Sequence, residues 1–339
     1  MFIHELKSMV ASYKACESDR QKHVLATVVR LNGSSYRKPG VGMLIREDGK
    51  MTGAVSGGCV EKEVYRQSLE VFDTDKPKLM TYDGRYRLGC EGILYILIEP
   101  FRPAPHWFDS YDESLQTRLS ISFRSYFDHK DFQQSGAGTI FFMGDSPIGV
   151  RPKEEINQNL PNQHVENMDP AFRLVIVGGE HDAVELCKLA SGVGWEVEVV
   201  TSPREKKSAA VYSGAARVNG LEPGQYDVSR IDSQTAVVLM SHNYATDLHF
   251  LLHIAGTRPA YVGLLGPSAR KEKLLAELIE REPLIDTGFL DLIHGPAGLD
   301  IGSTTPQEIG VSIISEILST TRKHNPLVLS DRRENQRIG

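Results

Sequence analysis

The second half of the chain alternates apolar runs with helical patterns, starting at Phe172. Apolar runs that predict strands cover residues 173–177, 196–200, 236–240 and 260–264. Helical patterns are predicted at residues 182–191, from residue 247 onward, between Pro267 and Ile279, and from Pro306 to Leu318. Strands that alternate with helices in this way are typical of a parallel sheet covered on both faces. We therefore expect an α/β fold in which residues 166–322 form a Rossmann-like, doubly wound domain, followed by a flexible tail at 323–339.

The first part of the chain mixes the helical and strand periods. Apolar positions at three- and four-residue steps predict an amphipathic helix over residues 2–18, with Cys16 on its apolar face. The remaining predicted elements are a strand at 24–31, a hairpin of 41–46 and 50–55 around Asp48-Gly49, a helix at 59–72, and strands at 78–82 and 93–98. These elements predict a small α+β domain over residues 1–105.

Residues 106–165 have the weakest pattern. Ser120 to Phe127 mixes aromatic and polar residues, while Gly138 to Met143 has the composition of a strand. Lys153 to Gln163 is polar and contains asparagine and proline, which favours a loop. We expect an extension of the first domain plus a linker, with the domain boundary near residues 160–170.

Composition narrows the class of protein. The chain has 339 residues, 40% of them hydrophobic and 24% charged, as in a soluble protein of two domains. A net charge of −6 does not indicate a nucleic-acid surface. No apolar run reaches the roughly 20 residues that cross a bilayer, and the start lacks the order of a signal peptide. Four cysteines without close pairing do not form a disulfide framework, so we expect a reduced, cytoplasmic protein.

Three glycine-rich loops in the first domain have the composition of a binding site: residues 33–40, 56–61 and 89–92. Glycine lets the backbone approach a ligand, and a predicted helix start after Gly58 favours an anion and a thiolate at Cys59. The opposing interpretation is a tight turn followed by a small buried cysteine. Residue types alone do not decide between the two, although Cys90 in the third loop favours a site.

Cys59 and Cys90 lack the spacing of a zinc site. The remaining interpretations are thiolate ligands to a soft metal, a redox couple and a persulfide relay.

A second candidate site lies in the predicted Rossmann domain, where ligands sit beyond the carboxyl ends of the strands. Its turns carry residues 178–181, 241–243 and 266–270, residues 294–295 are a fourth candidate turn, and a later loop carries Asp300. The candidate binding residues are Gly178, Gly179, Glu180, His181, His242 and Asp300. The dinucleotide fingerprint fails here, because Glu180 replaces the middle glycine and Thr201-Ser202 replaces the ribose-binding acid. The motif therefore does not support NAD(P) as a cofactor.

Four histidines and Cys187 have a structural interpretation as well as a functional one. His181 and His242 are candidates for metal binding or proton transfer, and equally for turn residues that bond their own backbone. His249 and His253 have the i, i+4 spacing of metal ligands, but without a third ligand we expect a solvated or packed helix face. Cys187 falls on one helix face with Ala183 and Leu186, so it is predicted to be core.

Together, these motifs resemble the XdhC/CoxI family of accessory factors for molybdenum hydroxylases such as xanthine dehydrogenase. The first domain carries Gly33-Ser-Ser-x-Arg37-x-Pro39-Gly40, Gly53-x-Val-Ser-Gly-Gly-Cys59-Val-Glu61 and Gly89-Cys90-x-Gly92, and then Ile98-Glu99-Pro100. The second carries Val237-Val-Leu-Met-Ser-His242, Ala260-Tyr-Val-Gly-Leu-Leu-Gly266 and Gly298-Leu-Asp-Ile-Gly302.

The resemblance implies a protein that binds molybdenum cofactor, supports its sulfuration and helps to insert it into an apo-hydroxylase. For such a function we expect Cys59 to handle the metal or its sulfur, Cys90 to be its neighbour and Arg37 to contact the anionic part of the cofactor. The other candidate contacts are Ser34, Ser35, Gly40, Ser56, Gly57, Gly58 and Glu61. The implied partners are a xanthine dehydrogenase-like client and a cysteine desulfurase, and we also expect a homo-oligomer.

Two other functions compete with the chaperone: an NAD(P)-binding Rossmann oxidoreductase and a thiol redox sensor that uses Cys59 and Cys90. A chain of this kind can carry the label xanthine dehydrogenase, but it has neither an iron–sulfur cysteine set nor room for a molybdopterin catalytic domain. We therefore expect a maturation chaperone rather than a catalyst.

Overall fold

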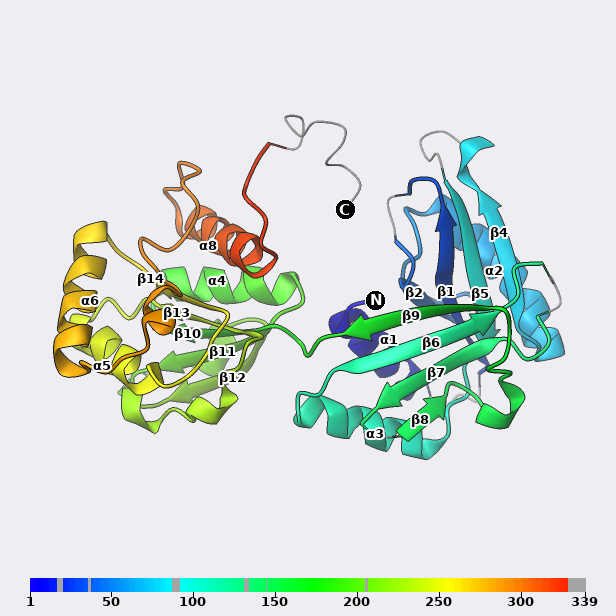
Figure 1. Ribbon diagram of the computed structural model, residues 1–339, viewed down its shortest axis with the longest axis horizontal. Helices are drawn as coiled ribbons and strands as arrows, with labels where there is room; N and C mark the ends of the chain where they lie inside the picture. Colours follow the sequence, from blue (N-terminus) through cyan, green and yellow to red (C-terminus); the bar gives the residue numbers. More distant parts are fainter. Residues whose placement is uncertain are drawn as a thin grey trace. The chain divides into compact units, whose positions relative to one another are not determined.

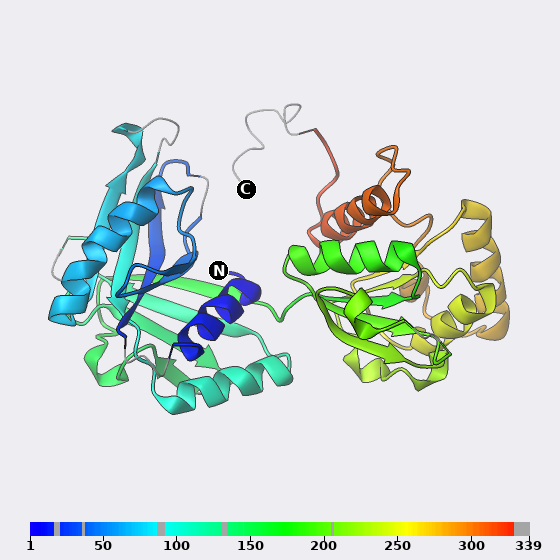
Figure 2. The ribbon, with the colours of Figure 1, turned by 180° about the vertical axis from the view of Figure 1, so that it is seen from behind.

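The computed structural model describes residues 1–16, 21–35, 38–86, 92–130, 134–144, 146–204 and 207–328, except the side chains of Cys59, Tyr86 and Ser146. By its internal contacts the chain divides into two units, Met1–Pro170 and Ala171–Gly339 (Figure 1; the same ribbon from behind in Figure 2). Among the described helices, none has the length and apolar character needed to span a bilayer.

The first unit contains a five-stranded antiparallel sheet, sheet A, in the order β3-β2-β1-β5-β4. Its strands are β1 (His23–Asn32), β2 (Gly42–Arg46), β3 (Met51–Gly53), β4 (Lys78–Asp83) and β5 (Ile93–Pro100). Helix α2 (Cys59–Thr74) covers one face and packs Val60, Val64 and Val71 against it. Helix α1 (Ile3–Lys14) buries Leu6 and Met9. These elements confirm the predicted α+β arrangement, including the hairpin and the start of α2.

A second antiparallel sheet, sheet B, belongs to the same unit and has the order β8-β7-β6-β9. It consists of β6 (Ile121–Phe127), β7 (Gly138–Met143), β8 (Ser146–Gly149) and β9 (Asn162–Met168), and helix α3 (Pro105–Gln116) precedes it. The predicted loop at 153–163 is wrong at its end, where β9 begins. Exposed and half-buried positions alternate along β9, and pairing with β6, which a sequence pattern does not show, makes it a strand.

A buried carboxylate connects the two sheets of the first unit. Glu99 at the end of β5 accepts hydrogen bonds from the backbone N–H of Thr139, at 3.0 Å, and from its Oγ1, at 2.5 Å, in β7. Arg151 Nε lies 4.0 Å from Glu99 Oε2. Burial raises the pKa of Glu99 to about 7, while the Thr139 bonds and Arg151 act in the opposite direction. The Ile98-Glu99-Pro100 motif therefore holds the two sheets together.

The second unit is built on a parallel six-stranded sheet, sheet C, in the order β12-β11-β10-β13-β14-β15. Its strands are β10 (Arg173–Val177), β11 (Glu196–Thr201), β12 (Ala215–Gly220), β13 (Thr235–Leu239), β14 (Tyr261–Leu264) and β15 (Ile293–His294). Helices α4 (His181–Gly192) and α8 (Pro306–Thr321) pack on one face, while α5 (Tyr244–Ile254) and α6 (Ser268–Arg281) share the other core with the short α7 (Thr287–Leu290). This architecture confirms the predicted Rossmann-like fold. β12 and β15 were not predicted, because β12 is polar and largely exposed and β15 has two residues.

Candidate functional site

The three glycine-rich loops leave the same edge of sheet A. β1 ends at Asn32 opposite Ile93, where β5 begins, and Asp83 at the end of β4 also pairs with Ile93. β2 begins at Gly42, and its Met43 pairs with Gly53 at the end of β3. The described ends of these three connections, at residues 33–35 and 38–41, at 54–58, and at 84–86 and 92, therefore lie at one edge of sheet A. The sequence places these motifs far apart, and the antiparallel topology places them at one edge.

The first and third loops touch through a glycine. A Cβ atom on Gly92 would lie 2.5 Å from the carbonyl oxygen of Ser34, so a side chain at this position collides with the backbone of the first loop. Ser34 is exposed and Ser35 is half-buried. Gly92 therefore allows the backbone just before β5 to lie against Ser34.

The second loop is organised around the carboxylate of Glu61. The backbone N–H groups of Ser56 and Gly58 each donate to this carboxylate at 2.7 Å, one to each oxygen. Gly58 has φ +113°, and the positions where Gly57 and Gly58 lack a Cβ face open space. Two of the loop's donors are therefore satisfied within the chain, and Glu61, predicted to contact a cofactor, holds the loop in shape.

Gly40 has a packing role in the structure. It is buried with φ +94°, and a Cβ there would overlap the carboxylate of Glu166 in β9. The predicted candidates Arg37 and Cys90 lie outside the described residues, as does the side chain of Cys59. The backbone places Cys59 at the first residue of α2, directly after the loop of Ser56 to Gly58.

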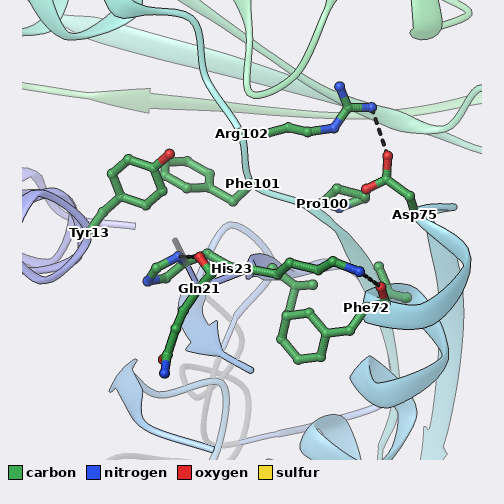
Figure 3. A pocket seen from close by; sticks show the side chains of 11 residues that line it. Tyr13, Gln21, His23, Phe72, Asp75, Pro100, Phe101 and Arg102 are labelled. Carbon is green, nitrogen blue, oxygen red and sulfur yellow. Dashed lines mark hydrogen bonds and ion pairs between the residues drawn. The ribbon is translucent and has the colours of Figure 1, made fainter. Parts of the chain in front are cut away.

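A cavity of about 220 Å³ lies at the other edge of sheet A, where β1 begins and β5 ends (Figure 3). Its lining includes Tyr13, His23, Phe72, Phe101 and Arg102. His23 Nδ1 donates to the carbonyl oxygen of Gln21 at 3.0 Å, and burial lowers the pKa of this imidazole. The cavity is therefore separate from the edge that carries the glycine-rich loops.

In the second unit, Gly178 directly follows β10, at the carboxyl edge of sheet C. Its φ is +143°, and a Cβ would overlap the carbonyl of Met240 at the end of β13. The neighbouring carbonyl of Gly179 accepts from Lys207 Nζ at 2.6 Å and from Tyr212 Oη at 3.0 Å. This turn is therefore tightly fixed against both adjacent strands.

The turn after β10 is acidic. Lys207 Nζ lies 3.0 Å from Glu180, whose side chain is 59% exposed. His242 follows β13 with φ +56°, and its Nε2 lies 3.6 Å from the carboxylate of Asp182 in the first turn of α4. His181 begins α4 and is exposed. Glu180 and Asp182 thus occupy the place where a dinucleotide-binding fold receives a pyrophosphate.

Two candidate interpretations find no support in the contacts. Asp300 is exposed, and within the described chain no contact joins it to the turns after β10 and β13. No group of three or more histidine, cysteine or acidic side chains suited to a metal occurs among the described residues.

His253 Nε2 lies 2.7 Å from the carbonyl oxygen of Tyr226, which agrees with a packed helix face. Cys16 and Cys187 are buried, as predicted, and burial raises the pKa of Cys187 to about 11.

Comparison with known families agrees with both units. The profile of the XdhC Rossmann domain matches residues 174–317, which span sheet C from β10 to α8. The profile of the XdhC and CoxI family matches residues 16–83, which include the loops of Ser34 and of Ser56 to Cys59. The chain belongs to the XdhC/CoxI family. The resemblance inferred from the motifs is thereby confirmed.

Relatives of this XdhC/CoxI protein align over nearly its whole length. A probable xanthine dehydrogenase subunit of Bacillus subtilis strain 168 is 26% identical over 323 residues, which cover 90% of this chain and 95% of that protein. The molybdenum cofactor insertion chaperone PaoD of Escherichia coli K12 is 24% identical over 305 residues, which cover 87% and 82%. A crystal structure described as a xanthine dehydrogenase from Bacillus halodurans has the same fold, with a TM-score of 0.77, 24% identity and coverage of 94% and 97%.

Some important residues of this family member were not recognisable as candidates in the sequence. Lys207 holds both Gly179 and Glu180, but it lies in a polar connection without a motif. Asp247 was expected near His181 and His242, but its burial was not, because its place in the first turn of α5 is typical of a solvated helix start. A charged residue at a helix start becomes a candidate for a special role only when it is known to be buried.

Proposed function

We propose that this chain is a molybdenum cofactor insertion chaperone for a xanthine dehydrogenase-type hydroxylase. In this function it binds the cofactor, supports its sulfuration and delivers it to the apo-enzyme. The observation that most strongly supports the proposal is that the strands flanking the three motif segments all end or begin at one edge of sheet A. PaoD, whose name states this activity, aligns with 87% of the chain.

The residues at this edge fit the chemistry of the cofactor. Its terminal phosphate suits the start of α2, where the helix dipole favours an anion. Because Glu61 already accepts from the N–H groups of Ser56 and Gly58, Arg37 is the expected charged contact of this phosphate. Its molybdenum is thiophilic, and Cys59 begins α2, where a thiolate is favoured. We assign Cys59 to the metal or its sulfur, Cys90 to a neighbouring position and Arg37 to the phosphate. We assign Ser34, Ser35 and Gly57 to the side of the loops that is accessible to the cofactor.

Glu61 preserves the shape of the second loop in this account. Its carboxylate satisfies the N–H groups of Ser56 and Gly58, so the loop does not depend on a ligand for its conformation. A preformed loop reduces the ordering entropy that binding costs. Transient binding and release, which delivery requires, are favoured by such a site because it remains folded when empty.

The NAD(P)-dependent alternative has less support. Glu180 stands in place of the middle glycine, and its pairing with Lys207 fixes the carboxylate near the helix start. We expect no saturable binding of NAD⁺ or NADPH in a calorimetric titration of the full chain. Tight binding would revive the oxidoreductase.

Delivery is tested by reconstitution. Cofactor-loaded protein mixed with a molybdenum-free xanthine dehydrogenase apo-enzyme should restore hydroxylase activity, and Cys59→Ala protein prepared in the same way should not. A cysteine desulfurase added with cysteine should increase the activated fraction. If free cofactor alone activates the apo-enzyme to the same extent as cofactor-loaded protein does, the chaperone role is contradicted. Sedimentation analysis of the same preparation tests the expected homo-oligomer.

A further inference from the structure

A buried ion pair lies at the carboxyl edge of sheet C, between the turns that follow β13 and β14. Asp247 in α5 is 2% exposed, and its two carboxylate oxygens have different partners. Ser241, which follows β13, donates its hydroxyl to Oδ1 at 2.5 Å, and Arg270 in the first turn of α6 donates Nη2 to Oδ2 at 2.8 Å. The turn after β13 and the turn after β14 are therefore joined through one carboxylate.

The guanidinium of Arg270 is held on more than one side. Its Cζ lies 5.7 Å from the ring centroid of Tyr244, within the range of a cation–π contact. Gly266, at φ +116°, leaves space for the Arg270 side chain, because a Cβ there would lie 2.9 Å from Cδ. An arginine oriented in this way loses little conformational freedom when it binds a ligand.

Arg270 keeps unused donors. Its side chain is 23% exposed, and among the described residues only Asp247 accepts a hydrogen bond from the guanidinium. The fork geometry of this group suits a phosphate or carboxylate. If Arg270 served only to neutralise Asp247, its guanidinium would not need to be accessible to solvent.

The start of α6 adds positive potential at the same place. Pro267 at its N-cap offers no side-chain cap, and the first turn contains no acidic residue. Arg270 and Lys271 lie in the first turn, where the macrodipole disfavours basic residues, and Glu272 and Lys273 follow them. A bound anion would offset the repulsion between these basic side chains and the positive end of the helix dipole. The turn after β10 has the opposite character, because Glu180 and Asp182 lie there.

We propose that Arg270, oriented by Asp247 and Tyr244, binds the phosphate group of a phosphate ester at the carboxyl edge of β13 and β14. The glycine turn after β10, where the fold ordinarily receives phosphate, is acidic in this chain, so the anion site is displaced by two strands. This site lies in the second unit and does not depend on the proposed chaperone function of the loops in sheet A. Its failure would leave that function untouched, and the reverse also holds.

The test is a calorimetric titration of the purified full chain with AMP, adenosine, inorganic pyrophosphate and malonate. We expect AMP and pyrophosphate to bind, adenosine not to bind, and malonate to bind more weakly, since a carboxylate carries less negative charge than a phosphate monoester. Arg270→Gln should weaken phosphate binding at least about tenfold, since a hydrogen bond to a charged group is lost. Arg258→Gln is the matched control: Arg258 is 90% exposed and precedes β14, at the amino edge of the sheet, and its loss should leave affinity unchanged.

Arg270→Gln leaves Asp247 buried without its cationic partner, which endangers the fold. The double variant Asp247→Asn/Arg270→Gln removes both charges, and it should fold while remaining defective in phosphate binding. Arg270→Lys keeps the charge without the fork, and an intermediate affinity is expected. Absence of phosphate binding in the wild type, equal affinity in the folded double variant, or binding of malonate in place of phosphate would each overturn the proposal.

Discussion

Gly92 lies so close to Ser34 that a Cβ atom would stand 2.5 Å from the serine carbonyl oxygen. This contact joins the segment that begins β5 to the loop that ends β1, and both belong to the edge of sheet A that carries the candidate site. The requirement for glycine here is therefore one of backbone approach. It gives the family motif Gly-Cys-x-Gly a physical reason at its last position.

The first prediction concerns this contact. Gly92→Ala should lower the free energy of unfolding by about 1–3 kcal/mol, because the methyl group meets backbone atoms that have little room to move. Chemical denaturation measures the change. Gly57→Ala is the matched control, since nothing lies within 4 Å of its missing Cβ. Equal stability of the two variants would show that the loops at Ser34 and Gly92 are not packed as described.

Glu61 provides a second prediction. Glu61→Ala removes the acceptor of the Ser56 and Gly58 N–H groups and should cost about 1–2 kcal/mol, in the range of a lost helix cap. The loss should appear in urea unfolding together with faster amide hydrogen exchange at residues 56–58. Glu63→Ala, two residues along α2, removes a surface carboxylate that contacts Arg66, and should leave exchange in the loop unchanged. Unaltered exchange in the Glu61 variant would contradict its role in the loop.

The pH dependence of stability is predicted from Glu99. Burial raises the pKa of its carboxyl group from 4.5 to about 7, so the folded chain binds a proton that the unfolded chain has released between these values. This contribution to stability is complete below pH 4.5 and is lost as the pH rises through 7, by about 3 kcal/mol. Glu99→Gln should abolish this part of the difference between unfolding free energies at pH 5 and pH 8. If the free energy of unfolding of the variant depends on pH as that of the wild type does, another group causes the effect.

A fourth prediction tests the turn after β10. Gly178→Ala introduces a Cβ at φ +143° against the carbonyl of Met240, and should destabilise the second unit by at least about 2 kcal/mol. Gly192→Ala in α4 meets no atom within 4 Å and should retain or raise stability. Thermal unfolding of the two variants measures the contrast. If Gly178→Ala unfolds at the wild-type temperature, the tight approach between β10 and β13 is absent.

The sequence predicted the second unit more fully than the first. Strands β10, β11, β13 and β14 are continuous apolar runs because both faces of a parallel sheet are covered, and this pattern is local. β9 is polar and becomes a strand through its pairing with β6, which no local pattern contains. Helix α3 was not predicted, although its buried side chains Trp107, Tyr111 and Ser114 recur at helical spacing, because Ser114 is polar and interrupts the apolar pattern.

The candidate site shows the same division. Glycine spacing and the position of Cys59 before a helical pattern were sufficient to predict the loops and the start of α2. The partners of individual side chains were not predictable, because they depend on tertiary approach. Glu61 turned toward its own loop, and Gly40 packed against Glu166. Assignments to Arg37 and Cys90 remain predictions from the family motif.

The most direct test of the central claim is the molybdenum and pterin content of protein purified from a host that makes the cofactor. Wild type, Cys59→Ala and Cys90→Ala are compared, with Cys187→Ala as a control thiol that is buried in the core of the second unit. The chaperone account predicts stoichiometric molybdopterin in the wild type and the Cys187 variant, and its loss in the Cys59 variant. Absence of molybdenum and pterin from every preparation, with no uptake of added cofactor by the apo-protein, would contradict it.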